Sequence, residues 1–458
     1  MELIADLHLH SRFSRAVSQK MNLINMYIYG KKKGINLLTV ADFTHPIWFK
    51  EIKNQLEEVG SGIYKIRNKE EIDHENNFDN KAYIGPYFFL SVEIASIYSE
   101  NGKVHKIHNL IFAPDFSVAE KINKTLMSSG FNLASDGRPI LGLSARNLYD
   151  LLLSIDKNII IIPCHIWTPW FSMYGSKSGY DHLDDCFGDY SKYIYAVETG
   201  LSSDPNMNWR IKDLDGRSIV SSSDAHSLEK MAREATVFKT LGKGKFSEIS
   251  YSDMVSAFKQ DKSGKLEISY TIEFYPEEGK YHYTGHRLCH VSYSPEEVKK
   301  KGKICPVCKR ELTVGVMDRV EDLATSTDSS VFEKDRNGVV WVKDKNGKRP
   351  PYVSIVPLLE IIREALGVAS ISNKVTEIYD KLINNLAPEF EILLRTPLSD
   401  IEKVSGENVA DAIDKVRTRN LTIEPGFDGE FGKVVIEINK AKTEETIQES
   451  KDQLGFGF

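Results

Sequence analysis

The feature that most constrains this chain is a series of short apolar segments, each followed closely by histidine or an acidic residue. The segments are rich in β-branched residues and alternate with helical patterns, so they are predicted strands. Before residue 275 they cover 3–7, 36–41, 87–94, 106–112, 158–163, 193–197 and 218–222. Strands that alternate with helices are typical of a mostly parallel sheet or barrel.

Histidines and acids recur where these predicted strands end. His8 and His10 form an H-x-H pair after the first strand, and alternation puts both imidazoles on one side of the chain. Further candidates lie in or after the later strands: Asp42, His45, Glu93, His108, His165, Glu198, Asp224 and His226. Barrel active sites are assembled at the carboxyl ends of parallel strands. The pattern predicts a site for divalent metal ions, with His165, Glu198 and Asp224 as candidate catalytic residues.

A single histidine or acid after a strand is more often a cap or a turn residue than a ligand, and for His45, His105 or Glu198 alone that interpretation is favoured. Repetition at successive strand ends favours a metal site instead, because clustered imidazoles and carboxylates are how such sites are built. After the second strand, either Asp42 or His45 could be the ligand. His165 and Asp224 could act as ligands or as bases beside the metals.

The expected chemistry of such a site is phosphoester hydrolysis. Clustered cations polarise phosphoryl oxygens, lower the pKa of a bound water and stabilise the leaving oxygen. Mixed imidazole and carboxylate ligands suit Zn²⁺ or Mn²⁺ better than an all-oxygen Mg²⁺ site, although affinity alone does not decide which ion is bound.

Several short motifs resemble the polymerase and histidinol phosphatase (PHP) superfamily: DLHLHS at 6–11, Glu93, His108, Cys164-His165, Val197-Glu198 and SDAH at 223–226. The resemblance implies a distorted (β/α)7 barrel over residues 1–275 that holds two or three divalent ions. The sequence departs from the family at Asp42-Phe-Thr-His45, where Thr-Asp-His is frequent. It departs again at Arg15, where an acid or histidine is common, which leaves the third metal position open.

A second unit, residues 276–322, is too small to be stabilised by a hydrophobic core alone, so it needs a cross-link such as a bound metal ion or a disulfide. His286-x-x-Cys289 and Cys305-x-x-Cys308 offer four nitrogen and sulfur ligands in two pairs, which predicts a tetrahedral structural zinc. His282 competes with His286 for the fourth position. The sparse, odd number of five cysteines favours a reducing compartment, so the cytoplasm is expected.

A basic run surrounds the second cysteine pair, and it comprises Lys299, Lys300, Lys301, Lys303, Lys309 and Arg310. Such a run is usually a solvated face. Beside a zinc site and a phosphodiesterase-like centre, contacts with a phosphate backbone become the better interpretation. The net charge of −6 means that any role in nucleic-acid binding must rest on local patches of this kind.

Residues 323–438 are expected to form a mainly helical DNA-binding domain. A helix is predicted to begin at Pro357, and apolar residues from Val375 to Leu386 recur at helical spacing. Residues 439–458 are predicted to be a flexible tail. Gln453 to Phe458 resembles the peptides that bacterial proteins insert into the sliding clamp, although a frayed tail is the simpler interpretation. No stretch is long and apolar enough to suggest a membrane span.

Longer motifs resemble the endonuclease Q family of DNA-repair enzymes over residues 1–438: HIWTPWFSMYGSKSG at 165–179, VETGLSSDP at 197–205, YHYTGHRLC at 281–289, LTVGVMDRVEDLA at 312–324 and PGFDGEFGKV at 425–434. This resemblance implies cleavage of DNA on the 5′ side of deaminated bases, such as uracil and hypoxanthine, and at abasic sites. An enzyme that reads a damaged base takes it out of the stack.

Aromatic residues that directly follow His165 are candidates to hold such a base: Trp167, Trp170, Phe171 and Tyr174. Their spacing equally fits a buried helical face, so a core role is the alternative. Two other functions are weighed against the endonuclease: a small-molecule phosphatase of the histidinol-phosphate type, and a noncatalytic DNA-binding scaffold whose metals are structural.

Overall fold

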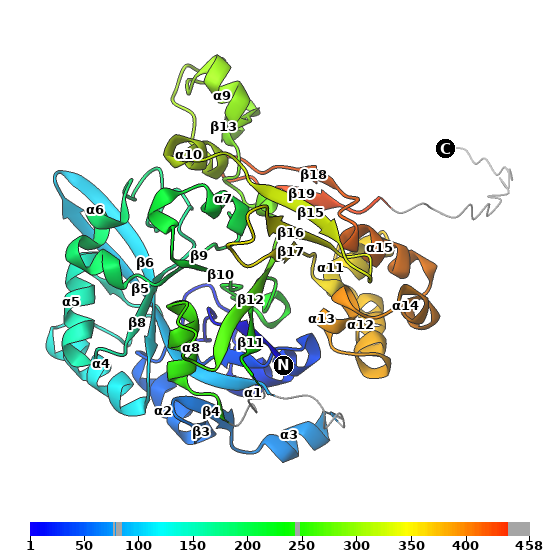
Figure 1. The fold of residues 1–458 in the computed structure, drawn as a ribbon, viewed down its shortest axis with the longest axis horizontal. Helices are drawn as coiled ribbons and strands as arrows, with labels where there is room; N and C mark the ends of the chain where they lie inside the picture. Colours follow the sequence, from blue (N-terminus) through cyan, green and yellow to red (C-terminus); the bar gives the residue numbers. More distant parts are fainter. Residues whose placement is uncertain (77, 79–84, 243–247, 438–458) are drawn as a thin grey trace, which may run out of the picture.

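The structure is a computed structural model that describes residues 1–437 except 77, 79–84 and 243–247. Its centre is a mixed sheet in the order β15-β16-β17-β12-β11-β1-β2-β5-β4-β3, to which β6, β7 and β8 attach through β5 and β6. Helices α4 to α6 cover one side of the molecule and α11 to α15 the other, while β13 and α9 project at the top (Figure 1).

The strands are β1 (Glu2–Asp6), β2 (Leu37–Thr39), β3 (Leu56–Gly60), β4 (Ile63–Ile66), β5 (Tyr87–Glu100), β6 (Lys103–Ala113), β7 (Ile140–Leu141), β8 (Ile160–Pro163), β9 (Ala196–Glu198), β10 (Ser218–Val220), β11 (Ala235–Thr240), β12 (Leu266–Glu273), β13 (Thr284–His286), β14 (Val291–Tyr293), β15 (Ser330–Lys334), β16 (Val340–Asp344), β17 (Tyr352–Ser354), β18 (Thr422–Glu424) and β19 (Lys433–Val435). Each of the strands predicted before residue 275 is present.

The α-helices are α1 (Leu23–Lys33), α2 (Pro46–Gln55), α3 (Lys69–Glu75), α4 (Phe116–Ser128), α5 (Ala145–Ile155), α6 (Leu183–Phe187), α7 (Pro205–Trp209), α8 (Tyr251–Phe258), α9 (Pro295–Lys301), α10 (Val316–Leu323), α11 (Leu358–Ala365), α12 (Asn373–Asn385), α13 (Glu389–Leu394), α14 (Leu398–Ser405) and α15 (Glu407–Arg417). The predicted helices that follow Pro357 and contain Val375 are confirmed as α11 and α12. None of the helices in the described ranges is long and apolar enough to cross a membrane.

The sheet is less parallel than the sequence pattern indicated. Pairs β1–β2, β2–β5 and β12–β17 are parallel, but β1–β11, β11–β12, β5–β6 and β6–β8 are antiparallel. The long β5–β6 pair is a hairpin whose turn contains Asn101 and Gly102, both at positive φ. Asn-Gly is the strongest short-range hairpin signal, because both turn residues must adopt positive φ. The expectation of a mostly parallel sheet is therefore wrong here, and the sequence carried the signal that would have corrected it.

Residues 323–356 also differ from the expected helical domain. Strands β15, β16 and β17 lie there, and β17 pairs in parallel with β12, so this segment extends the central sheet. The helices begin only after Pro357.

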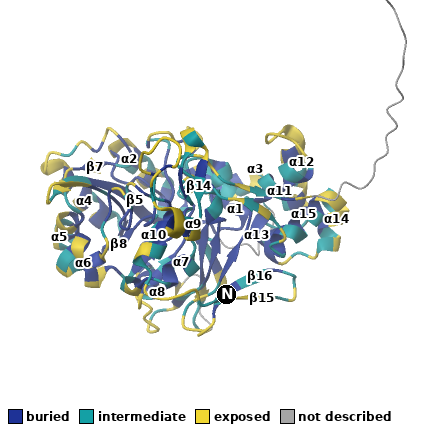
Figure 2. Cartoon of the chain, turned by 90° about the horizontal axis from the view of Figure 1, so that it is seen from above, coloured by how far each residue is buried: buried dark blue, intermediate teal, exposed yellow. Residues whose placement is uncertain are grey.

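Burial is concentrated in the sheet and the inner helix faces, and exposed residues lie mainly in outer loops and helix ends (Figure 2). The candidate ligands after β1 are thus carried on a buried strand end, where their positions are fixed.

Candidate metal centre

A short bridge between two chain segments brings the two histidine motifs together. Leu9 pairs in parallel with Ala225, and the His10 N–H donates to the Ala225 carbonyl at 3.2 Å. His8 and His10 therefore lie beside Asp224 and His226, although more than 200 residues separate them in sequence. Asp6 holds this arrangement, since its carboxylate accepts hydrogen bonds from Ser223 N at 3.0 Å and Ala232 N at 2.7 Å. Asp6 was not identified from the sequence as a residue that positions the site.

The ligand atoms converge without bonding to one another. His10 Nε2 lies 3.0 Å from Asp224 Oδ1 and 3.3 Å from Glu93 Oε2, and His8 Nε2 lies 3.7 Å from Asp224 Oδ1. Yet His8 Nε2, His10 Nε2 and Asp224 Oδ1 are buried and make no hydrogen bond in the structure. Unsatisfied buried polar atoms are rare in folded proteins, and a bound cation satisfies them. The donor set, imidazole and carboxylate, fits a divalent metal.

The electrostatics of the cluster favour positive charge. Burial disfavours a charged imidazole at His8, but Glu198 and Asp224 outweigh it and raise the pKa of His8 well above its ordinary value. Burial also opposes the charged form of His10, and there Asp224, Asp42 and Glu93 raise the pKa. Carboxylates thus dominate the field at both rings. A buried site with this excess of negative charge attracts cations, whether protons or metal ions.

Glu93 connects a second group of candidate ligands to the first. Its Oε1 lies 2.5 Å from His108 Nδ1 and 3.1 Å from His165 Nε2. Its other oxygen accepts a hydrogen bond from Arg138 Nη1 at 3.0 Å. Because Glu93 faces His10 as well, one carboxylate joins the groups His8–His10–Glu93 and Glu93–His108–His165. This geometry suits two neighbouring ions that share a carboxylate ligand.

Arg138 was missed in the sequence, because it lies in a turn-rich loop and not at a strand end. Asp136 accepts a hydrogen bond from the Arg138 N–H at 3.1 Å and orders the loop. Gly137 packs so closely that a Cβ there would lie 2.5 Å from Asp42 Oδ2. Arg15, the position where the PHP motif differs, instead extends outward with its side chain 78% exposed and pairs with Asp136. The guanidinium within the site is therefore that of Arg138.

Glu198 and Cys164 lie on the other side of His8. Glu198 Oε2 is 3.0 Å from His8 Nδ1 and accepts a hydrogen bond from the backbone N–H of His165 at 3.0 Å. A carboxylate on the second nitrogen of a ligating imidazole fixes the orientation of the ring. Glu198 also belongs to a group with His8 and Cys164 that could itself hold an ion. Glu198 thus lies where it could act either as a metal ligand or as the residue that orients His8.

Asp42 and His45 do not join any candidate metal group in the described part of the chain. Asp42 accepts hydrogen bonds from Ser11 N at 2.6 Å and Ser14 Oγ at 2.9 Å, and its Oδ1 lies 3.3 Å from His10 Nδ1. His45 is the N-cap of α2, where its Nδ1 accepts from Trp48 N at 3.4 Å. Asp42 thus orients His10 through Nδ1, the nitrogen that faces away from the other ligands. His45 caps a helix, which was the alternative to a ligand role in the sequence analysis.

Several residues of the cluster adopt backbone conformations that side chains rarely take. His165, Asp224 and Asp42 have φ of +30°, +47° and +46°. Each such residue costs about 1–3 kcal/mol, and such residues concentrate at functional sites. The rest of the fold therefore offsets this strain and holds these side chains in position.

The four aromatic residues after His165 divide into two pairs. Trp167 and Tyr174 are buried and stack at 4.9 Å, and Trp167 Nε1 donates to Asn208 Oδ1 at 2.8 Å, so they are core residues. Phe171 packs against the His108 ring at 4.9 Å, and Trp170 is 36% exposed. Of these four residues, Phe171 thus lies against a candidate ligand, and Trp170 is partly exposed.

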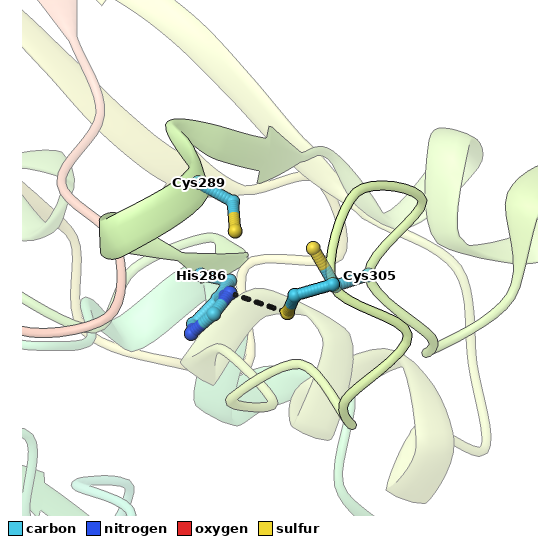
Figure 3. Close-up of side chains that lie close together, drawn as sticks. His286, Cys289 and Cys305 are labelled. Carbon is cyan, nitrogen blue, oxygen red and sulfur yellow. Dashed lines mark hydrogen bonds between the residues drawn. The ribbon is translucent and has the colours of Figure 1, made fainter.

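The second candidate metal group lies in the projecting unit. His286, Cys289, Cys305 and Cys308 bring their ligand atoms within 4.8 Å of one another, and three of these side chains point toward a common centre in Figure 3. Cys308 Sγ lies 3.3 Å from His286 Nδ1. The backbone N–H of Cys308 helps to lower the pKa of Cys305 to about 6, which favours the thiolate that metals bind. His282 is buried outside the group, where burial lowers its pKa to about 4.

The basic run is partly neutralised within the chain. Lys299 pairs with Glu321 at 3.2 Å, Lys301 with Glu297 at 2.7 Å, and Lys303 with Asp318 and Asp322 at 3.0 and 2.9 Å. Lys300, Lys309 and Arg310 are exposed. The Lys301–Glu297 pair is exposed on both sides, and pairs of that kind contribute little to stability.

Comparison with known proteins first identifies relatives of parts of the chain. A family model described as the MJ0043 C-terminal domain matches residues 357–420. The uncharacterised protein MJ0043 of Methanocaldococcus jannaschii is 28% identical over 301 residues, which are 64% of this chain and 35% of that protein. The chain therefore corresponds to about a third of the length of this relative.

Two solved structures match almost the entire chain. The lesion-specific endonuclease PfuEndoQ from Pyrococcus furiosus is 29% identical, with a TM-score of 0.76 over 95% of this chain and 96% of that one. Endonuclease Q in complex with a 27-mer duplex with an abasic lesion at the active site is also 29% identical, with a TM-score of 0.77 over 97% of this chain and 100% of that one. The chain is thus similar to endonuclease Q, in sequence and in fold, over 95–97% of its length.

Proposed function

We propose that this protein is a DNA-repair endonuclease that hydrolyses the phosphodiester bond on the 5′ side of deaminated bases, such as uracil and hypoxanthine, and at abasic sites. The observation that carries the proposal is the buried cluster of His8, His10, Glu93 and Asp224, in which His8 Nε2, His10 Nε2 and Asp224 Oδ1 make no hydrogen bond. The likeness, over 97% of the chain, to endonuclease Q in complex with a duplex with an abasic lesion supports DNA as the substrate.

Two or three divalent ions, Zn²⁺, Mn²⁺ or Mg²⁺, would supply the chemistry: an activated water nucleophile and neutralisation of charge on the phosphate. The residues of the chain have distinct tasks around them. His8, His10, Glu93, His108, His165, Asp224 and His226 are the proposed ligands. Glu198 and Asp42 hold the two histidines of the first motif in orientation, and Asp224, with Oδ1 3.0 Å from His10 Nε2, is the proposed catalytic residue among the ligands.

The strands that carry these ligands are proposed to form the distorted seven-stranded barrel of the PHP superfamily. The parallel order β1–β2–β5 and the parallel pair β9–β10 support this, since His8, Asp42, Glu198 and Asp224 follow these strands at the same end.

The rest of the chain is proposed to grip DNA. A structural zinc at His286, Cys289, Cys305 and Cys308 would hold a small unit whose basic run, Lys299 to Arg310, contacts the phosphate backbone. Residues 357–437 would add helical contacts. Gln453 to Phe458, the proposed clamp-binding peptide, lies outside the described residues. Reduced thiols at the zinc group fit a cytoplasmic location.

One assay separates this proposal from its rivals. A labelled duplex with a single deoxyuridine, incubated with Mg²⁺ or Mn²⁺, is expected to be nicked immediately 5′ of the deoxyuridine. Hydrolysis of a small phosphomonoester without nicking would instead identify a small-molecule phosphatase. Retention of the duplex with neither reaction would identify a binding scaffold.

A further inference from the structure

A continuous strip of aromatic and basic side chains leads from the metal cluster onto the projecting unit. The Phe171 ring packs against His108 at 4.9 Å, with Lys106 Nζ 5.1 Å from its centre. The preceding residue, Trp170, meets Tyr281 edge to face at 5.5 Å. Lys280 Nζ then lies 5.5 Å from the Tyr281 ring and 5.8 Å from Phe431. We call Phe171, Trp170, Tyr281, Lys280 and Phe431 the aromatic strip.

Phe431, the outer end of the strip, is an exposed aromatic residue. Phe431 is 73% exposed and Trp170 36% exposed, whereas half of the aromatic residues in the described chain are buried. Three separate segments, 170–171, 280–281 and 431, supply these side chains, so the strip is a product of the fold and not of a local repeat. Exposed apolar side chains gathered beside a site mark a binding surface.

The loop that presents Phe431 is held tightly to its neighbours. Gly426 N donates to Glu277 O at 2.8 Å, Gly429 N to Lys280 O at 2.8 Å, and Gly432 N to Glu278 O at 3.1 Å. A Cβ at Gly432 would lie 2.1 Å from Glu277 O, and one at Gly426 would lie 2.5 Å from Gly279 O, so neither position has room for a side chain. The exposure of Phe431 therefore does not come from a loose loop. Its ring is presented in a fixed place, which lowers the entropic cost of binding.

The charge of the strip points to the chemistry of its partner. Lys106 and Lys280 lie over its rings, and Arg287 lies beside the same loop, its backbone N–H bonded to Asp428 at 2.8 Å. Aromatic rings interleaved with cations suit unpaired nucleobases on a phosphate backbone, because each base offers a face for stacking. An apolar protein partner would gain nothing from cations placed over the rings.

We propose that the aromatic strip stacks on nucleobases of the DNA next to the lesion and keeps them unstacked from the duplex. This inference rests on the proposed function, because it takes DNA as the substrate. Phe171 and Trp170 would contact the nucleotide at the metal cluster. Tyr281 and Phe431 would hold bases farther along, and Lys280 would contact a phosphate between them.

The test uses the full chain with Asp224→Asn, so that bound DNA is not cut, and a duplex with one abasic site and 2-aminopurine next to it. Phe431→Ala is expected to weaken binding about tenfold, as loss of one stacked base does, and to remove most of the rise in 2-aminopurine fluorescence. Phe431→Trp is expected to restore both. The matched control is Tyr193→Ala, which removes another exposed aromatic ring beside a lysine, 37% exposed and not part of the aromatic strip.

The outcomes separate the strip from the proposed function. If Phe431→Ala and Tyr281→Ala bind the duplex as tightly as Tyr193→Ala does while the wild-type protein nicks it, the proposed stacking role of the strip is wrong. The proposed endonuclease activity is then unaffected. If the wild-type protein neither binds nor nicks the duplex, DNA as the substrate is wrong, and the strip falls with it. Equal thermal unfolding of the three alanine variants excludes misfolding as the cause of weaker binding.

Discussion

Asp42 Oδ1 lies 3.3 Å from His10 Nδ1, on the side of the ring opposite Glu93 and Asp224. The carboxylate therefore sets which nitrogen of His10 faces the metal cluster. A partner of this kind tunes a ligand without touching the metal, and its loss typically costs 10–100-fold in metal affinity or activity.

The first prediction separates Asp42 from His45, the two residues that the sequence could not distinguish. Asp42→Asn is expected to lower nicking about 10–100-fold and to weaken metal binding measured by titration calorimetry. His45→Ala removes a helix cap, so it is expected to cost about 1 kcal/mol of unfolding free energy while metal affinity stays unchanged. Loss of metal affinity in His45→Ala alone would reverse the assignment.

The second prediction concerns the group of His286 and three cysteines. Cys305→Ser with Cys308→Ser is expected to remove one equivalent of zinc, measured by atomic emission, and to make residues near 286–310 sensitive to protease. Metal binding at such sites supplies much of the folding free energy of a small unit. Metal binding at the first cluster, measured by titration calorimetry, serves as the control and is expected to persist. Unchanged zinc content in the double variant would contradict the site.

The third prediction is a pH dependence that arises from two buried carboxyl groups behind the site. Burial raises the pKa of Glu273 to about 8, and Asp204 contributes to that rise. Burial also raises the pKa of Glu234 well above its ordinary value, with further contributions from Glu273 and Glu198. The ordinary pKa of a glutamate, near 4.5, applies in the unfolded chain. A carboxyl whose pKa is higher in the folded state contributes its full stabilisation below that pH, where it is protonated in both states. That contribution is lost as pH rises through about 8.

Urea unfolding of the wild-type protein between pH 5 and 9 is accordingly expected to show falling stability, at up to about 1.4 kcal/mol per pH unit for each group. Glu273→Gln keeps an acceptor for Ser221 but carries no charge, so its curve is expected to be flatter. A variant with the same slope as the wild type would show that Glu273 titrates normally.

The fourth prediction contrasts two tryptophans three residues apart. Trp167 is buried against Tyr174, so Trp167→Ala is expected to cost about 3–5 kcal/mol of unfolding free energy. Trp170 is partly exposed, and Trp170→Ala is expected to change stability by less than about 0.5 kcal/mol but to weaken binding of a lesion duplex. Equal destabilisation of the two variants, seen by urea unfolding, would contradict this division.

Much of the metal centre followed from the sequence, because strand ends fix where the next residues lie. His8, His10, Glu93, Asp224 and His226 could be placed together on that basis, and the structure brings them together. The zinc group was predictable for a simpler reason, since a two-residue gap fixes the distance between the ligands of a pair.

What the sequence did not reveal depends on long-range packing. Arg138 reaches Glu93 from a loop whose position is set by Gly137 against Asp42, and no local pattern encodes that contact. The same holds for the division between Trp167 and Trp170, because helical spacing cannot say which ring is covered. The antiparallel β5–β6 pair was missed although Asn101-Gly102 signals it, because the repeated strand-end residues suggested parallel strands throughout.

The most direct test of the central claim is the rate at which a duplex with a single abasic site is nicked, measured against added Mn²⁺ or Mg²⁺ after treatment with a chelator. The wild-type protein is expected to lose activity on chelation and regain it with metal. Asp224→Asn is expected to stay at least about 10³-fold slower, as variants of paired catalytic groups are, with unchanged thermal unfolding. Nicking by Asp224→Asn at the wild-type rate, or by the chelated wild-type protein, would contradict the assignment of the His8–His10–Glu93–Asp224 cluster as the catalytic metal centre.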